Sequence, residues 1–188
     1  YTASIDQCLL SGKFLDLHRI LSSIRKHTQD RVIIVSNFTS TLNLLQRYCV
    51  RQKFPFLRLD GRTKADVRSK MVNEFNSDSG SDHLAKQPFV FLLSSKSGGV
   101  GLNLIGANRL ILFDSDWNPA TDRQAMARIH RDGQLKPCFI YRLLLVGSMD
   151  EKIYQRQITK IGLSDSLMSN AVSFTHLGAH ETLRPLVC

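Results

Sequence analysis

Five short apolar runs alternate with segments of helical periodicity along this chain, and that alternation constrains the fold more than any other feature. The runs cover residues 31–35, 56–59, 89–93, 109–113 and 138–146. Runs of this kind, with few polar residues, are typical of strands that are buried on both faces. Strands that alternate with helices usually form a parallel sheet. The pattern therefore predicts an α/β fold, with a mainly parallel sheet flanked by helices on both faces.

Local signals mark where several of the helices begin. Segment 11–27 carries apolar residues three and four apart, as expected for the buried side of a helix. Thr63 and Asp66 have the spacing of a capping box, which predicts a helix start at Thr63. Residues 148–151 predict a last helix start in the same way, with the helix ending near Lys160.

The charge of the chain is strongly positive. Lys and Arg outnumber Asp and Glu by 25 to 16, which gives a formal net charge of +9. Residues 47–70 alone hold eight bases and two acids, and such a local excess favours a polyanionic partner. The four cysteines are widely spaced without a CxxC pair, so no metal ligands are assigned. No apolar run approaches the roughly 20 residues that cross a bilayer, so no membrane partner is expected.

The length of 188 residues, 43% of them hydrophobic, suits one substantial core. We expect a lead-in at residues 1–10 and a single lobe over residues 11–164. The remaining segment, 165–188, lacks clear periodicity and receives no role.

Two arginines stand out after the fourth apolar run. Asn118 and Pro119 read as an N-cap and the first residue of a helix. On a helix that starts there, Gln124, Arg128 and Arg131 fall at i, i+4 and i+7, which is one polar stripe. Guanidiniums keep their charge and match phosphate oxygens, so the pair suits the charge that develops on a transferred γ-phosphoryl group. The plain alternative is the solvated edge of a helix.

A glycine-rich segment, 94–103, follows the third apolar run directly. Its Gly98, Gly99 and Gly101 would let backbone amides approach an anion closely, at the strand end where open α/β sheets bind ligands. The plain alternative is a turn between strands. The chain contains no GxxxxGK[ST] loop and no acidic cluster suited to Mg²⁺. We therefore expect arginines for phosphoryl transfer without the groups that grip the nucleotide and metal, and no hydrolysis by this chain alone.

Several motifs, in order, resemble the second RecA-like lobe of SWI/SNF-related, superfamily-two DNA translocases. The resemblance covers about residues 11–162 and rests on segments 11–13, 58–63, 94–103, 113–119 and 124–134. The RNA helicases of the DEAD-box group share this architecture, but their characteristic motifs are missing here. Within the family, the residues of three segments most resemble those of the Rad-fifty-four recombination branch: 91–96, 140–144 and 151–157. Segments 128–134 and 159–165 lean toward its Rdh or B-type paralogues.

The resemblance implies a role for each matched residue. Arg128 and Arg131 would reach the γ-phosphate across a cleft between two lobes, helped by Gln124. Gly99, Gly101 and Asp114 would border the nucleotide cleft, and Trp117 would couple ATP turnover to DNA movement, although packing alone would also explain a tryptophan there. The residues expected to contact the DNA backbone are Asn37, Arg62, Thr63, Ser94, Ser95, Lys96 and Gly98.

The resemblance also implies a function for the whole protein. It would be a nuclear, ATP-dependent translocase on double-stranded DNA that works with a recombinase filament in homologous recombination and DNA repair. ATP and Mg²⁺ would be held mainly by a first RecA-like lobe that this chain does not contain. Two alternatives stay open at this point: the motor lobe of a nucleosome-remodelling ATPase, and a non-catalytic α/β module that binds nucleic acid.

Overall fold

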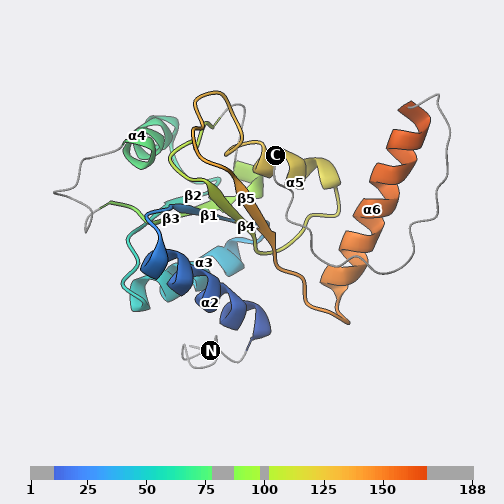
Figure 1. Cartoon of the computed structure of the whole chain (residues 1–188), viewed down its shortest axis with the longest axis horizontal. Helices are drawn as coiled ribbons and strands as arrows, with labels where there is room; N and C mark the ends of the chain where they lie inside the picture. Colours follow the sequence, from blue (N-terminus) through green and yellow to red (C-terminus); the bar gives the residue numbers. More distant parts are fainter. Residues whose placement is uncertain (1–10, 78–86, 98–101, 169–188) are drawn as a thin grey trace.

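The computed structural model describes residues 11–77, 87–97 and 102–168, with side chains described as far as residue 162. Helices and strands alternate along this part of the chain (Figure 1). The strands are β1 Val32–Ser36, β2 Phe56–Leu59, β3 Val90–Ser94, β4 Arg109–Leu112 and β5 Phe139–Arg142. The helices are α2 Gly12–His27, α3 Thr39–Arg51, α4 Ala65–Asn76, α5 Pro119–Met126 and α6 Met149–Met168, with a short 3₁₀ turn, η2, at Ser95–Ser97.

The five strands form one sheet in the order β2-β3-β1-β4-β5, and every neighbouring pair is parallel. The central strand β1 pairs with β3 on one side and with β4 on the other, so that Ile33 lies between Phe91 and Leu110. Both β1 and β3 are buried at every position, as the unbroken apolar runs predicted. The predicted α/β fold with a parallel sheet is confirmed.

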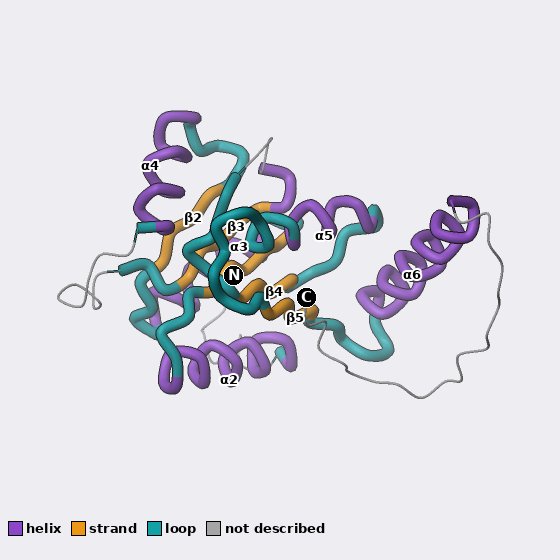
Figure 2. Tube along the Cα trace, turned by 45° about the horizontal axis from the view of Figure 1, so that its top comes forward, coloured by secondary structure: helices purple, strands orange, loops and turns teal. Residues whose placement is uncertain are grey.

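Alternate residues of the strands enter two separate apolar clusters, one on each face of the sheet. One cluster joins Ile34 of β1 to the buried sides of α2 and α3, including Leu17 and Leu45. The other joins Ile33 to Phe75 of α4 and to the region of α5. The views in Figures 1 and 2 show α2 and α3 on one side of the sheet and α4 with α5 on the other. Helices on both faces were predicted and are present.

The last helix and the last strand differ from the lengths predicted. Strand β5 ends at Arg142, whereas the apolar run continues to residue 146; Leu145 and Val146 are exposed in the turn before α6. Helix α6 continues to Met168, past the predicted end near Lys160 and past the lobe boundary proposed at residue 164. It lies beside the β5 edge rather than over a face of the sheet (Figure 2).

Helix α5 is shorter than the arginine spacing predicted, and this is a correction. It begins as expected, because Asn118 accepts a hydrogen bond from the Ala120 amide and Pro119 is its first residue. It ends at Met126, before both Arg128 and Arg131. The carbonyl of Arg128 accepts a hydrogen bond from the distant Leu104 amide at 3.1 Å. Gly133 has φ +98°, a conformation outside the helix that glycine adopts readily.

Candidate functional site

Polar residues meet where the parallel strands end, at the carboxyl edge of the sheet. The side-chain carboxylate of Asp114, just after β4, accepts hydrogen bonds from the Ser36 hydroxyl at 2.5 Å and from the backbone N–H of Asn37 at 2.6 Å. The Ser95 hydroxyl donates to the side-chain oxygen of Asn37. Three strand ends, those of β1, β3 and β4, are thereby joined by side chains. Of these residues, Asn37, Ser95 and Asp114 were predicted site residues, and the structure brings them together.

Burial dominates the electrostatics of Asp114. Loss of hydration raises the pKa of its carboxyl above the ordinary value, while the hydrogen bonds from Ser36 and Asn37 and the charge of Lys13 act in the opposite direction. The Lys13 ammonium donates to the Phe113 carbonyl at 2.8 Å and pairs with Asp150 at 2.5 Å. Helices α2 and α6 are thus tied to the end of β4 beside this carboxylate.

The start of the glycine-rich segment lies next to this group. Ser94 is the last residue of β3 and is buried, whereas Lys96 in η2 is exposed. The Ser97 hydroxyl donates to the Ser94 carbonyl at 2.9 Å, and Arg68 of α4 donates to the Ser97 carbonyl at 3.1 Å. The predicted cleft and DNA-binding residues Gly98, Gly99 and Gly101 lie outside the described residues.

Helix α4 begins without the predicted cap. Lys64, rather than Thr63, is its N-cap residue, and no side chain caps the helix. The Thr63 hydroxyl instead accepts a hydrogen bond from the Asp60 amide at 3.2 Å, which closes the tight turn after β2. The exposed Arg62 and Lys64 stand at this helix start, where the dipole disfavours cations. Asp66 in the first turn supplies one negative charge there, and the helix amides with the two cations would favour a further anion.

The three residues predicted to act on the phosphate differ in exposure. Gln124 lies on the exposed side of α5, and Arg131 is exposed in the turn that follows. Arg128 is only 6% exposed. The pKa of Arg128 is lowered from its ordinary value, first by burial and then by the positive charge of Arg131. An anion beside the two arginines would act in the opposite direction and favour the charged form of Arg128.

Trp117 lies in the connection between β4 and α5, two residues before the helix, and is 49% exposed. Its ring lies 5.7 Å from the Arg156 guanidinium, and its carbonyl accepts a 3.5 Å hydrogen bond from Lys160. Both partners belong to α6. The tryptophan is thus held against α6 rather than inserted into the core.

Two features of the site were missed in the sequence. Ser36, which completes the contacts of Asp114, ends an apolar strand and could have been noticed as a lone hydroxyl there. The ion pair between Lys13 and Asp150 joins residues 137 positions apart in sequence, and no local pattern predicts such a contact.

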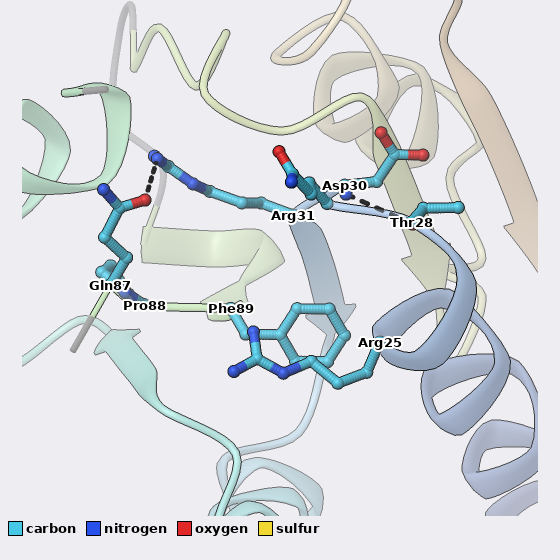
Figure 3. A pocket seen from close by; sticks show the side chains of 8 residues that line it. Arg25, Thr28, Asp30, Arg31, Gln87, Pro88 and Phe89 are labelled. Carbon is cyan, nitrogen blue, oxygen red and sulfur yellow. Dashed lines mark hydrogen bonds between the residues drawn. The ribbon is translucent and has the colours of Figure 1, made fainter. Parts of the chain in front are cut away.

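An open cleft in the described part of the chain lies elsewhere, at the amino ends of β1 and β3 (Figure 3). Its volume is about 410 Å³. None of the predicted site residues lines it; the lining is Arg25, Thr28, Gln29, Asp30, Arg31, Gln87, Pro88 and Phe89. Arg31 is occupied there by hydrogen bonds to the carbonyl of Ser77 and the side chain of Gln87.

The described residues hold no group of three or more His, Cys, Asp or Glu that could bind a metal ion. Among those same residues, no helix is long and apolar enough to span a membrane.

Comparison with known proteins places these features in a family. The helicase conserved C-terminal domain matches residues 12–133. The rice (Oryza sativa subsp. japonica) DNA repair and recombination protein RAD54 is 54% identical over 82% of this chain and 15% of its own length. Protein CHROMATIN REMODELING 25 of Arabidopsis thaliana is 49% identical over 94% of this chain and 19% of its own length. The chain therefore spans less than a quarter of the length of these curated relatives.

A solved structure supports the same assignment. The C-terminal part of the Fun30 ATPase domain superposes with a TM-score of 0.73 at 39% identity, over 81% of this chain and 46% of that one. The expected likeness to the recombination branch of SWI/SNF-related ATPases is confirmed, whereas the finer likeness to Rdh or B-type paralogues stays a prediction. With its parallel sheet, its match over residues 12–133 and its similarity to RAD54, this chain belongs to the helicase conserved C-terminal domain family.

Proposed function

We propose that this chain is the second, arginine-bearing motor lobe of an ATP-dependent translocase on double-stranded DNA. The exposed Arg131, three residues after the buried Arg128 in the segment that follows α5, is the observation that carries the proposal. An exposed guanidinium next to a second one can extend to an anion held by a neighbouring lobe, and its charge would be stabilised by that anion. Arg131 would be the residue that reaches the γ-phosphate, with Arg128 beneath it and Gln124 alongside.

We infer that this lobe supplies one wall of a nucleotide site. They offer cations for phosphate but no cluster of carboxylates for Mg²⁺. ATP and Mg²⁺ would accordingly be held mainly by the first lobe, and hydrolysis would need both lobes. Bound ATP would favour the closed arrangement of the lobes, and hydrolysis would release it. Asp114 with the glycine loop would border the cleft, and Trp117 would couple turnover to DNA movement.

The start of α4 supports contact with the DNA backbone. The exposed Arg62 and Lys64 outnumber the one acid of the first turn, Asp66, at a helix start without a side-chain cap, and such a site favours a phosphate. Arg62 and Thr63 lie there, and Lys96 is exposed at the end of β3. With Asn37, Ser94, Ser95 and Gly98, these residues would hold phosphates without reading bases, so binding should be independent of sequence and sensitive to salt.

Homologous recombination and DNA repair are the proposed process. The support is the similarity to proteins named for DNA repair and recombination, among them the rice RAD54 protein and the fission-yeast DNA repair protein rhp54. A recombinase filament would be the protein partner, and the nucleus the site of action.

Nucleosome remodelling is the second candidate. It is favoured by the name of the Arabidopsis relative, CHROMATIN REMODELING 25. The full-length protein would then reposition nucleosomes in an ATP-dependent assay and would not stimulate recombinase-driven strand exchange. The opposite result is expected for the recombination function.

The test of the ATPase role uses the full two-lobe protein and the substitution Arg131→Ala. We expect DNA-stimulated ATP turnover to fall by about 10³-fold or more, as for arginines that act on the γ-phosphate elsewhere. Affinity for duplex DNA should stay unchanged. Arg123→Ala is the matched control, because Arg123 is also exposed, in the last turn of α5. Turnover of the Arg131 variant within tenfold of wild type would remove Arg131 from the reaction.

A further inference from the structure

A buried polar cluster at the carboxyl end of β5 has no role in the function described so far. It consists of Arg142, Asp122 and Gln157, which we call the Arg142 cluster. Asp122 and Gln157 are 3% and 2% exposed, and the Arg142 side chain is 20% exposed. The three residues come from three different elements: β5, α5 and α6.

Arg142 is the centre of the cluster. Its Nη1 donates hydrogen bonds to Asp122 Oδ2 at 3.0 Å, to Gln157 Oε1 at 2.7 Å and to the Ser115 hydroxyl at 3.4 Å. Its guanidinium also lies 4.9 Å from the ring centroid of Tyr154 on α6. One side chain thus contacts the connection after β4, the helix α5 and the helix α6.

The other two members hold the connection that carries Asp114 and Trp117. Asp122 Oδ1 accepts a hydrogen bond from the Asp116 amide at 3.1 Å. The Gln157 amide group donates to Asp122 Oδ2 at 2.9 Å and also to the Asp116 carbonyl. Both backbone groups of Asp116, which lies between Asp114 and Trp117, are therefore bound by the cluster.

Helix α6 is attached mainly by polar contacts, and the Arg142 cluster is one set of them, beside the Lys13–Asp150 ion pair and the contacts of Trp117. Among its residues with described side chains, 149–162, Ile153 is the one buried apolar residue. Apolar packing by a single side chain restricts a helix weakly, because it has no preferred direction. Hydrogen bonds are directional, and a buried ion pair that is fully hydrogen-bonded contributes specificity of arrangement more readily than stability.

We propose that Arg142, Asp122 and Gln157 are positioning residues that make the connection carrying Asp114 and Trp117, helix α5 and helix α6 move as one unit. A displacement of the arginine-bearing segment after α5, driven by the state of the nucleotide, would then be transmitted to Trp117 and α6. The cluster would thereby link ATP hydrolysis to DNA stimulation without touching the nucleotide. This inference rests on the proposed motor function.

The lobe contains a matched control for the cluster. Arg109 lies on the neighbouring strand β4 and is half-buried, with a side chain 15% exposed. It forms an ion pair with Asp30 at 2.6 Å, and its guanidinium lies 4.6 Å from the ring centroid of Phe139. It lies at the amino end of the sheet, because it opens β4 and Arg142 closes β5. Arg109→Met and Arg142→Met therefore remove comparable interactions at opposite ends of the sheet.

The experiment compares these two variants in the full two-lobe protein, together with Arg142→Lys. The measurements are the thermal midpoint, the KM for ATP, the Kd for duplex DNA, and kcat with and without that DNA. We expect similar falls in midpoint for the two Met variants, and a DNA-stimulated kcat at least tenfold lower in Arg142→Met alone. KM and Kd should stay within twofold of wild type. Arg142→Lys should recover part of the kcat, because an ammonium can donate to the same three acceptors.

Equal kcat values in Arg142→Met and Arg109→Met would overturn this inference while leaving the motor function standing. If Arg142→Met does not fold, Gln157→Met replaces it, since it removes two hydrogen-bonding groups at similar side-chain length. The same selective loss of kcat is expected, and its absence counts equally against the inference. A wild-type protein without DNA-stimulated hydrolysis would instead overturn the proposed function and this inference with it.

Discussion

Replacement of Asp114 tests how the carboxyl edge of the sheet is held together. Its carboxylate is the common acceptor for Ser36 and Asn37, and the residue is 9% exposed. We expect Asp114→Ala to destabilise the lobe clearly. Asp114→Asn should be tolerated, because an amide oxygen can accept from the Asn37 amide while the amide nitrogen donates to the Ser36 hydroxyl.

The magnitude follows from the groups left behind. In Asp114→Ala the Asn37 amide loses its acceptor, which costs about 1–3 kcal/mol. Ser36 loses less, about 1 kcal/mol, because its hydroxyl also lies within 3.3 Å of the Phe38 carbonyl. The sum is about 2–4 kcal/mol, which corresponds to a fall in Tm of roughly 4–16 °C for a chain of this size. Asp114→Asn should cost about 1 kcal/mol or less.

The pH dependence gives an independent check of the same site. Burial raises the pKa of Asp114 in the folded state above the unfolded value. Such a carboxyl contributes stability that is present below the unfolded pKa and is lost as pH rises through the folded pKa. The wild type should therefore gain stability relative to Asp114→Asn as the pH falls from neutral through that folded pKa. The other carboxyl groups are common to both proteins, so their contribution to the pH dependence of stability cancels in the difference between the two.

Thermal unfolding followed by circular dichroism, over a series of pH values, supplies both measurements. A wild type that loses stability relative to Asp114→Asn on acidification would show that the hydrogen bonds from Ser36 and Asn37 outweigh burial. An Asp114→Ala variant as stable as wild type would show that Asp114 does not join the strand ends.

Two further substitutions test local packing and capping. Gly106→Ala should destabilise by about 1–3 kcal/mol or more, since the added Cβ would overlap the Phe75 carbonyl oxygen, a backbone atom that cannot turn aside; a urea midpoint equal to wild type would refute this close approach. Asn118→Ala should cost about 1 kcal/mol through loss of the cap to the Ala120 amide, whereas Asn118→Ser should restore most of it. Equal thermal midpoints for the Ala and Ser variants would show that the cap does not stabilise α5.

Much of the fold was predictable because its signals are local. The spacing of Leu17 and Leu21 on α2, and the unbroken apolar run of β1, reflect periodicities within a single element. The pair Asn118 and Pro119 marks the start of α5 by backbone chemistry that acts over two residues. The ordered motifs were enough to indicate the family.

The errors arose where a group outside the helix competes with the helical pattern. The helical spacing of Gln124, Arg128 and Arg131 predicted one helix, but the Leu104 amide takes the Arg128 carbonyl and the helix ends earlier. The capping pattern at Thr63 was equally regular, yet the Asp60 amide takes its hydroxyl. In both places an oxygen has two possible donors, and it accepts from the one that the helical pattern does not predict.

By itself, the sequence determined which segments are strands and helices, which of their sides are apolar, and to which family the chain belongs. Only the tertiary structure decided the strand order, the burial of Arg128 beside the exposed Arg131, and the meeting of Arg142, Asp122 and Gln157. The physical reason is that periodicity and turn chemistry act over a few residues. Exposure and polar partners, in contrast, depend on which distant segments are packed together.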